Sequence, residues 1–131
     1  MDECRQLLIS CEHGGNRVPP EYQSLFLGQN GLLESHRGYD PGALQLAKML
    51  AREMRVHLAK AETTRLLIDL NRSPQSKTLF SEIVAELDNK EKQLIIERYY
   101  LPYRAFVAKQ IRDYIACGAQ VVHLSVHSFT P

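Results

Sequence analysis

Short apolar runs alternate along the chain with longer segments in which apolar residues recur every three or four positions. Residues 7–11 form an apolar run that ends shortly before two glycines, a pattern typical of a short buried strand. Residues 56–61 and residues 65–70 predict two more strands, of which "RLLIDL" at 65–70 is the clearer. A further strand is predicted to begin at residue 120, in the sequence "QVVHLSVHS".

Two segments have the periodicity of amphipathic helices. In residues 43–54 apolar side chains recur at three- and four-residue steps, and Asp40 before Pro41 predicts an N-cap with proline at the first helical position. The second helix is predicted over residues 102–116, and Gly118 is suited to cap its end. Its expected apolar face consists of Tyr103, Phe106, Val107, Ile111, Tyr114 and Ile115.

Two further stretches are less regular. Residues 19–31 contain proline, glycine and asparagine and predict a loop with one helical turn, whereas residues 81–100 are expected to be helical. Strands thus alternate with helices along the chain. This order predicts a single α/β domain over residues 1–131, a three-layer αβα fold with a mixed, mostly parallel sheet.

The composition excludes several classes of protein. With 131 residues, 44% of them apolar and 24% charged, the chain is typical of a soluble globular domain. A net charge of +1 favours no polyanionic partner, and no apolar stretch reaches membrane-spanning length. The polar N-terminus "MDECRQ" lacks the pattern of a signal peptide, so we expect a cytoplasmic protein. The spacing of its cysteines matches no zinc finger, and we expect Cys11 and Cys117 to be reduced and partly buried.

Two histidines follow predicted strands and are candidates for metal binding. His13 lies in a glycine-rich turn directly after the first strand, and His127 lies at the end of the last one. Ligands of open α/β sheets bind outside the carboxyl ends of the strands, where two such histidines can converge on one zinc ion. The alternative is that each histidine caps its own strand by hydrogen bonding.

The stretch "RLLIDLNRSP" holds a second group of candidates. Asn71 and Arg72 follow a strand and could hold a carboxylate, while Arg65 could stabilise a developing oxyanion. The alternative is an Asx-type turn at Asn71 and a surface arginine. Asp69 lies inside the apolar run, and if its side chain is buried it must be paired with an arginine or a histidine.

The remaining candidates have less specific patterns. Asp40 is either a metal ligand or the helix cap described above, and His36 is a polar loop residue or a proton shuttle. His57 and His123 are expected to be structural. Cys11 lies two residues before His13, so a nucleophilic thiol is a third possibility, although packing is the more usual role for a cysteine in an apolar run.

Five stretches together resemble the N-formylglutamate amidohydrolase family. They are "ISCEHGGNRVP", "HRGYDPGAL", "TTRLLIDLNRSP", "YYLPYR" and "VVHLSVHSFTP", in the family's order and over nearly the whole chain. The resemblance implies a hydrolase of the zinc-carboxypeptidase-like fold. It also implies a small carboxylate substrate, most specifically N-formyl-L-glutamate, from which the family releases formate at the end of histidine breakdown.

The wider superfamily, which includes carboxypeptidases and aspartoacylase, implies a set of zinc ligands. Its His-x-x-Glu motif places the first ligand at His13 and the second at Asn16, where this sequence has asparagine instead of glutamate, and the last ligand falls on His127. Asp40 or Glu12 could supply the carboxylate instead.

By the same resemblance, residues of the third predicted strand and the turn after it act on the substrate. Asn71 and Arg72 would bind its carboxylate, and Arg65 lies near the superfamily's oxyanion arginine.

Family members continue beyond the length of this chain, which therefore resembles the N-terminal part of a longer enzyme, apparently truncated at its C-terminus. The superfamily's general base lies downstream of the last histidine ligand, so no residue here is a candidate for it. A second interpretation is a catalytically silent homologue that binds a small carboxylate or a partner protein. A truncated sheet would expose an unpaired edge, so a homodimer through that edge is also expected.

Overall fold

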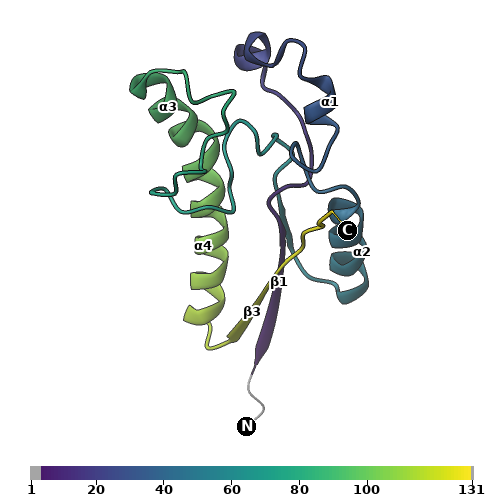
Figure 1. Cartoon of the computed structure of the whole chain (residues 1–131). Helices are drawn as coiled ribbons and strands as arrows, with labels where there is room; N and C mark the ends of the chain where they lie inside the picture. The colour runs from purple at the N-terminus through teal and green to yellow at the C-terminus, as the bar shows by residue number, and fades with distance from the viewer. Residues whose placement is uncertain (1–3, 131) are drawn as a thin grey trace.

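The computed structural model describes residues 4–130, which are built around a three-stranded parallel sheet. Strand β1 (Arg5–Cys11) lies in the centre, between β2 (Leu58–Lys60) and β3 (Gln120–Ser125). Both pairings are parallel, with Ile9 opposite Leu58 on one side of β1 and opposite Leu124 on the other. The carboxyl ends of all three strands therefore lie at one edge of the sheet (Figure 1).

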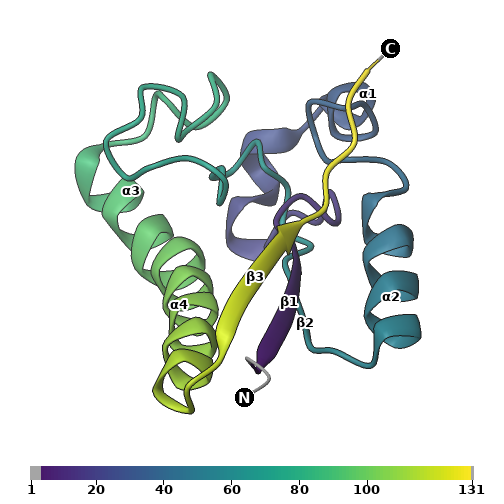
Figure 2. The same ribbon diagram turned by 90° about the horizontal axis from the view of Figure 1, so that it is seen from below.

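Helices α2 (Ala43–Met54) and α4 (Leu101–Ala116) cover opposite faces of this sheet (Figure 2). Side chains of a strand alternate between the two faces. Ile9 and Cys11 of β1 pack in one cluster with three alanines of α2, at positions 43, 47 and 51. Helix α4 lies against the other face. The α/β fold with three layers is confirmed, and the strands predicted at residues 7–11, 56–61 and 120–128 correspond to β1, β2 and β3.

The start of helix α2 differs from the sequence-based prediction. The helix begins at Ala43, and the residue before it, Gly42, has a φ of +82°, which glycine adopts without the strain that a side chain would cause. The predicted N-cap at Asp40, with Pro41 in the first helical turn, is wrong. The carboxylate of Asp40 instead lies 2.8 Å from Nδ1 of His127.

The other long helical segment is nearly continuous. It consists of α3 (Asn89–Ile95), a π-helical turn (Ile96–Tyr100) and α4. Asp88 caps its start by accepting a hydrogen bond from the Glu91 N–H at 2.8 Å.

Three predictions for this region have different outcomes. Helix is confirmed over residues 102–116 and over 89–100, but residues 81–88 form turns. The expected apolar face of α4 is wrong at Phe106 and Ile115, which are 51% and 57% exposed.

A second hydrophobic cluster joins the loops at the carboxyl edge of the sheet to the long helix. It takes side chains from a 3₁₀ helix (Pro20–Phe26), from helix α1 (Asn30–Leu33) and from residues 65–70. Residues 19–31 thus hold two short helices where one turn was expected. The cluster's fully or nearly fully buried members are Tyr22, Phe26, Leu33, Leu66, Leu67, Ile68, Leu70, Leu79, Val84, Ile95 and Tyr100.

The strand predicted at residues 65–70 is wrong. The segment forms a turn and irregular backbone, and its N–H groups bind single carbonyls: Arg65 N–H binds Gly38 and Asp69 N–H binds Leu79. The apolar run is buried because its side chains pack in the second cluster. Packing against loops thus requires the same apolar composition as packing in a sheet, and the sequence pattern does not distinguish the two.

The surface also departs from expectation in two places. Val122 and Leu124 of β3 are 55% and 41% exposed, and β3 is an edge strand of the described sheet, so the homodimer through this edge stays a prediction. Cys11 and Cys117 are free thiols, as expected, but Cys11 is fully buried and Cys117 is exposed, whereas partial burial was expected for both. Within residues 4–130, no helix combines the length and the apolar character needed to cross a bilayer.

Gly38 is the position at which added volume should destabilise the fold. A Cβ there would lie 2.1 Å from the carbonyl oxygen of Leu33, and the Gly38 carbonyl accepts hydrogen bonds from Thr64 and Arg65. We expect Gly38→Ala to lower the free energy of unfolding by about 1–3 kcal/mol in urea denaturation. Gly31→Ala is the matched control, because a Cβ at that helical position meets nothing within 4 Å. Equal stability of the two variants would contradict this expectation.

Candidate metal centre

Three side chains from distant parts of the chain meet at the carboxyl edge of the sheet. His13 follows β1 and His127 follows β3, and because these strands are parallel neighbours their ends carry both residues to one place. Asp40 joins them through its backbone N–H, which donates to the His13 carbonyl at 2.9 Å. One potential ligand atom from each residue lies within 4.8 Å of the other two.

The Asp40 carboxylate lies between the two imidazole rings. Its Oδ2 is 2.8 Å from Nδ1 of His127 and 3.4 Å from Nδ1 of His13. The ring centroids are 5.0 Å apart with an interplanar angle of 69°. His13 and Asp40 are each 3% exposed, so two of the three side chains are almost entirely buried. Both Nδ1 atoms thus face one carboxylate oxygen.

The far nitrogen of each ring is held by a separate partner. Nε2 of His13 lies 2.6 Å from Asp69 Oδ1, and Nε2 of His127 lies 2.8 Å from Ser125 Oγ and 3.4 Å from Glu12 Oε1. A carboxylate accepts but does not donate, so the His13 proton belongs on Nε2. His13 Nδ1 then carries a lone pair, and it is buried with no hydrogen-bond partner.

This arrangement fits a divalent cation. A lone pair on His13 Nδ1, the Asp40 carboxylate and His127 Nδ1 point to one place, where they would repel one another without a positive charge between them. Two imidazole nitrogens and a carboxylate oxygen are a donor set that zinc accepts. A proton on His127 can fill part of this role. The pKa of His127 is raised by its hydrogen bond to Glu12 and also by Asp40, against the opposing effect of burial.

Two further carboxylates remain ionised although they are buried. Burial raises the pKa of Asp69, but the hydrogen bond and charge of His13, the Asn71 N–H and Arg65 outweigh it, so the net shift is downward. Burial likewise raises the pKa of Glu12, and hydrogen bonds from His127, Ser125 and Tyr103 lower it to about 2. Their negative charges hold protons on the Nε2 atoms of the two histidines.

Arg65 lies beside this group and neutralises part of its charge. Its Nη2 is 3.0 Å from Asp69 Oδ2 and its Nη1 is 3.6 Å from Asp40 Oδ1. The sequence predicted that a buried Asp69 must be paired with an arginine or a histidine. Asp69 is buried and is paired with both. Arg65 also reaches a cavity of about 430 Å³. That cavity is lined by His36, Arg37, Arg65, Leu66, Asp69, Arg72, Thr78, Phe80, Ser81 and Glu82.

The predicted carboxylate-binding pair is divided between two cavities. Arg72 lines the first cavity, with its Nε 3.7 Å from Asp69 Oδ2. Asn71 lines a second cavity of about 340 Å³ on the side of helix α4. The Asx-type turn foreseen at Asn71 lies two residues earlier, because Asp69 Oδ1 accepts the Asn71 N–H at 2.9 Å. The second cavity is lined by Glu12, Leu70, Asn71, Tyr103, Arg104, Val107, Ala108, Ile111, His123 and Ser125.

Asn16, the second position of the ligand motif, makes its described side-chain contact elsewhere. Its Nδ2 donates to the Leu33 carbonyl at 2.9 Å, a bond that fastens the loop after β1 to helix α1. Asp40 is therefore better placed than Asn16 to supply the third ligand. Glu12, the other carboxylate considered for this role, is bound by Tyr103 and Ser125.

The structure disfavours a nucleophilic role for Cys11. Its thiol is buried in the apolar cluster under α2. Burial, together with the charges of Glu12 and Asp40, raises the pKa of this thiol to about 11, so it remains protonated at neutral pH. His123 has a partner that the sequence did not indicate, since its Nε2 lies 2.7 Å from Ser10 Oγ.

Sequence reasoning identified the partners of the two histidines only in part: it expected a buried Asp69 to pair with an arginine or a histidine, but it considered Glu12 only as a metal ligand. The sequence signal for Asp69 was its place as an acid inside an apolar run. The sequence signal for Glu12 was its position next to His13. Tyr103 gave no signal, because it looks like one residue of an amphipathic helix. Its hydroxyl nevertheless donates to Glu12.

Comparisons with known proteins support the family resemblance and the fold. Residues 5–131 match the sequence model of a family described as N-formylglutamate amidohydrolase. A gene product of Agrobacterium tumefaciens, known from a crystal structure, is similar in fold with a TM-score of 0.89 and 31% sequence identity. The similarity covers 97% of this chain and 53% of that one, so this chain spans about half the length of the relative. No curated protein matches.

Removal of Asp69 should strongly destabilise the site. The change would leave the buried Nε2–H of His13, the Asn71 N–H and Arg65 without their acceptor. We expect Asp69→Ala to lower the free energy of unfolding by about 3–5 kcal/mol, measured by chemical denaturation without metal.

The matched control for Asp69→Ala is Glu82→Ala. Glu82 also pairs with an arginine, at 2.7 Å from Arg37, but both side chains are more than half exposed. Its loss should cost less than about 1 kcal/mol. A cost for Asp69→Ala as small as that of the control would show that the buried network contributes nothing to stability.

Proposed function

This chain belongs to the N-formylglutamate amidohydrolase family, and on that premise we propose that it binds zinc and acts in the hydrolysis of a small N-acyl amino acid. N-formyl-L-glutamate, which would yield formate, is the substrate that the family name favours. One observation carries the proposal: the buried, unpartnered Nδ1 of His13 faces the same carboxylate oxygen as Nδ1 of His127.

His13, His127 and Asp40 would hold the ion, through one atom each. Zinc, when bound, supplies Lewis-acid chemistry, which polarises an amide carbonyl and makes water more acidic. Asp69 holds the His13 ring by its Nε2–H, and this hydrogen bond fixes the tautomer in which Nδ1 is free to act as a ligand. Asn16 remains an alternative ligand only if its amide leaves the Leu33 carbonyl.

Arg65 would stabilise negative charge on the substrate. Its guanidinium spans Asp40 and Asp69 and also lines the first cavity, so it lies between the candidate ligands and the space where a substrate would bind. A fixed positive charge at this position favours the oxyanion that develops when an amide carbonyl is attacked. Because Asp40 and Asp69 already orient the guanidinium, little reorganisation is needed.

Arg72 is the better candidate of the predicted pair for binding a substrate carboxylate. It lines the same cavity as Arg65 and is 51% exposed, so its guanidinium is accessible to a ligand. Asn71 lines the other cavity and would contact a different part of the substrate. The two residues would then act at different points, not as one clamp.

A second candidate function is binding without catalysis. Glu12, Asp40 and Asp69 are the buried acids of this region, and each is already paired with a histidine. Among residues 4–130 we therefore assign no general base. A silent homologue would bind a small carboxylate in the first cavity and release no formate.

Zinc binding should depend on His13. We expect His13→Ala to weaken zinc affinity by at least about 100-fold, since it removes one of three ligands, in a competition titration against a chromophoric chelator. His57→Ala is the control, because His57 is exposed and outside the candidate ligand group. Tight zinc binding by His13→Ala would refute the assignment of His13 as a ligand.

Formate release should distinguish the two candidate functions. The zinc-loaded chain is expected to release formate from N-formyl-L-glutamate, and Arg72→Ala should raise KM about 10–100-fold through loss of a charged hydrogen bond. Arg98→Ala, which removes an exposed arginine 3.9 Å from Glu21, should leave KM unchanged. Protection of the chain by N-formyl-L-glutamate against thermal unfolding, without any formate, would identify a silent binding homologue instead.

A further inference from the structure

A chain of hydrogen bonds links the candidate metal centre to helix α4. It begins at Asp40, whose Oδ2 lies 2.8 Å from His127 Nδ1, and continues from His127 Nε2 to Ser125 Oγ at 2.8 Å. The Ser125 hydroxyl contacts Glu12 Oε1, and the hydroxyl of Tyr103 contacts Glu12 Oε2. Ser125, Glu12 and Tyr103 thus lie outside the ligand set but are connected to it.

The contacts of Ser125 place a proton on Nε2 of His127. A serine hydroxyl has a single proton and a carboxylate oxygen accepts, so Ser125 donates to Glu12 and accepts from His127. The proton accepted by Ser125 is the one on Nε2 of His127. Nδ1 of the same ring lies 2.8 Å from Asp40 Oδ2, where a proton joins the two groups without metal and a cation would take its place.

Tyr103 determines how Glu12 is oriented. The Glu12 side chain is 7% exposed, and its two oxygens divide their contacts, Oε1 toward Ser125 and His127 and Oε2 toward Tyr103. Burial and the neighbouring charge of Glu12 both raise the pKa of Tyr103, so its hydroxyl keeps the proton that it donates. Without this donor, Oε2 would lose its hydrogen bond from Tyr103 in a buried place, which favours a turn of the carboxylate or entry of water.

We propose that Glu12 and Tyr103 are positioning residues, which hold the His127 ring, through Ser125, with Nδ1 directed at the metal position. The proposal rests on the proposed function, because it assumes that His127 binds zinc. Partners of this kind around metal-binding histidines typically change metal affinity by about 10–100-fold when they are removed. Helix α4 therefore contributes to metal affinity although it supplies no ligand.

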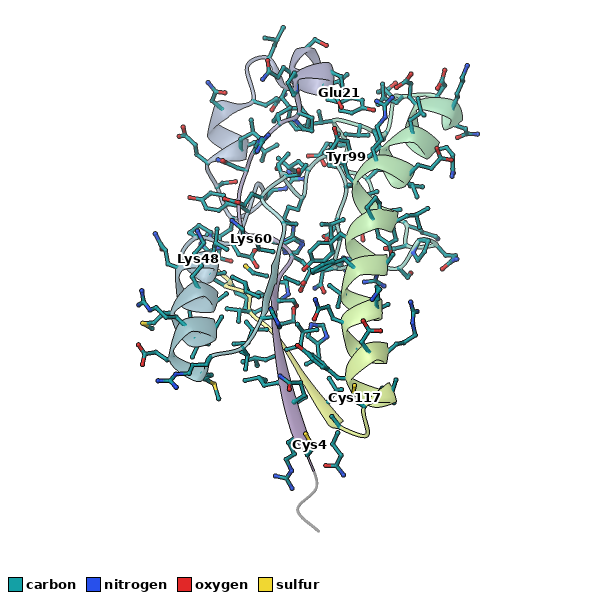
Figure 3. All side chains as sticks on the ribbon, turned by 180° about the vertical axis from the view of Figure 1, so that it is seen from behind. Cys4, Glu21, Lys48, Lys60, Tyr99 and Cys117 are labelled. Atoms are coloured by element: carbon teal, nitrogen blue, oxygen red, sulfur yellow. The ribbon has the colours of Figure 1, made fainter. Side chains whose placement is uncertain are left out.

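The test is zinc affinity of the whole chain, with two tyrosine variants compared. Tyr103→Phe removes only the hydroxyl that Glu12 accepts from, and we expect zinc affinity to fall about tenfold in a competition titration. Tyr99→Phe is the matched control, because the Tyr99 hydroxyl also donates to a glutamate, Glu21. Figure 3 shows Tyr99 and Glu21 together near one end of the molecule, opposite the end that carries Cys4 and Cys117. Zinc affinity should be unchanged in Tyr99→Phe.

A second readout reports the ring itself. Long-range ¹H–¹⁵N spectra of the zinc-loaded protein should show His127 with a proton on Nε2 and zinc at Nδ1, and Tyr103→Phe should speed exchange of that proton with solvent. Ser125→Ala removes the acceptor of the same proton and should weaken zinc binding to a similar extent, which keeps the test decisive if Tyr103→Phe does not fold. The melting temperature of each metal-free variant shows whether it is folded.

The outcomes separate this inference from the function on which it rests. Wild-type zinc binding that is equal in Tyr103→Phe and Ser125→Ala would overturn the positioning role and leave the metal assignment intact. Equal losses in Tyr103→Phe and Tyr99→Phe would also overturn it, since they would reflect a general loosening of the helix. Zinc found at Nε2 of His127 would do the same. No zinc binding by the wild type would refute the proposed function and this inference together.

Discussion

The candidate site depends on one buried carboxylate oxygen, Oδ2 of Asp40, which lies 2.8 Å from one histidine nitrogen and 3.4 Å from another. Neither contact is favourable between unprotonated atoms, so a proton or a cation must lie between them. A proton satisfies only the shorter contact, and His13 Nδ1 remains without a partner. A divalent cation would satisfy all three atoms, which is the physical reason for proposing a metal centre here.

The fold builds this convergence from simple elements. Parallel pairing of β1 with β3 brings the residues that follow both strands to one edge. The loop that holds Asp40 is fixed to the His13 carbonyl by a backbone hydrogen bond, and positive φ at Gly42 lets α2 begin after it. Arg65 and the two histidines offset the charges of three buried acids at positions 12, 40 and 69. Removing any one partner therefore leaves a charge in a place that water does not reach.

Sequence patterns predicted the parts that depend on local periodicity. Strand β1, helix α2 and the histidines at strand ends follow from apolar spacing and from the rule for parallel sheets. Residues 65–70 were misread, because burial against loops produces the same apolar run as burial in a sheet. Asp40 was read equally well as a cap or a ligand, and only its distance to His127 decides between them. Tyr103 could not be predicted, because its role depends on how α4 packs on the sheet, 91 residues away from Glu12 in sequence.

The most direct test of the metal centre is a crystal structure of the zinc-loaded chain, with anomalous diffraction measured on both sides of the zinc absorption edge. The account predicts one strong anomalous peak within bonding distance of Nδ1 of His13, Nδ1 of His127 and a carboxylate oxygen of Asp40. A peak at Nε2 of either histidine, or no peak beside Asp40 at saturating zinc, would contradict it.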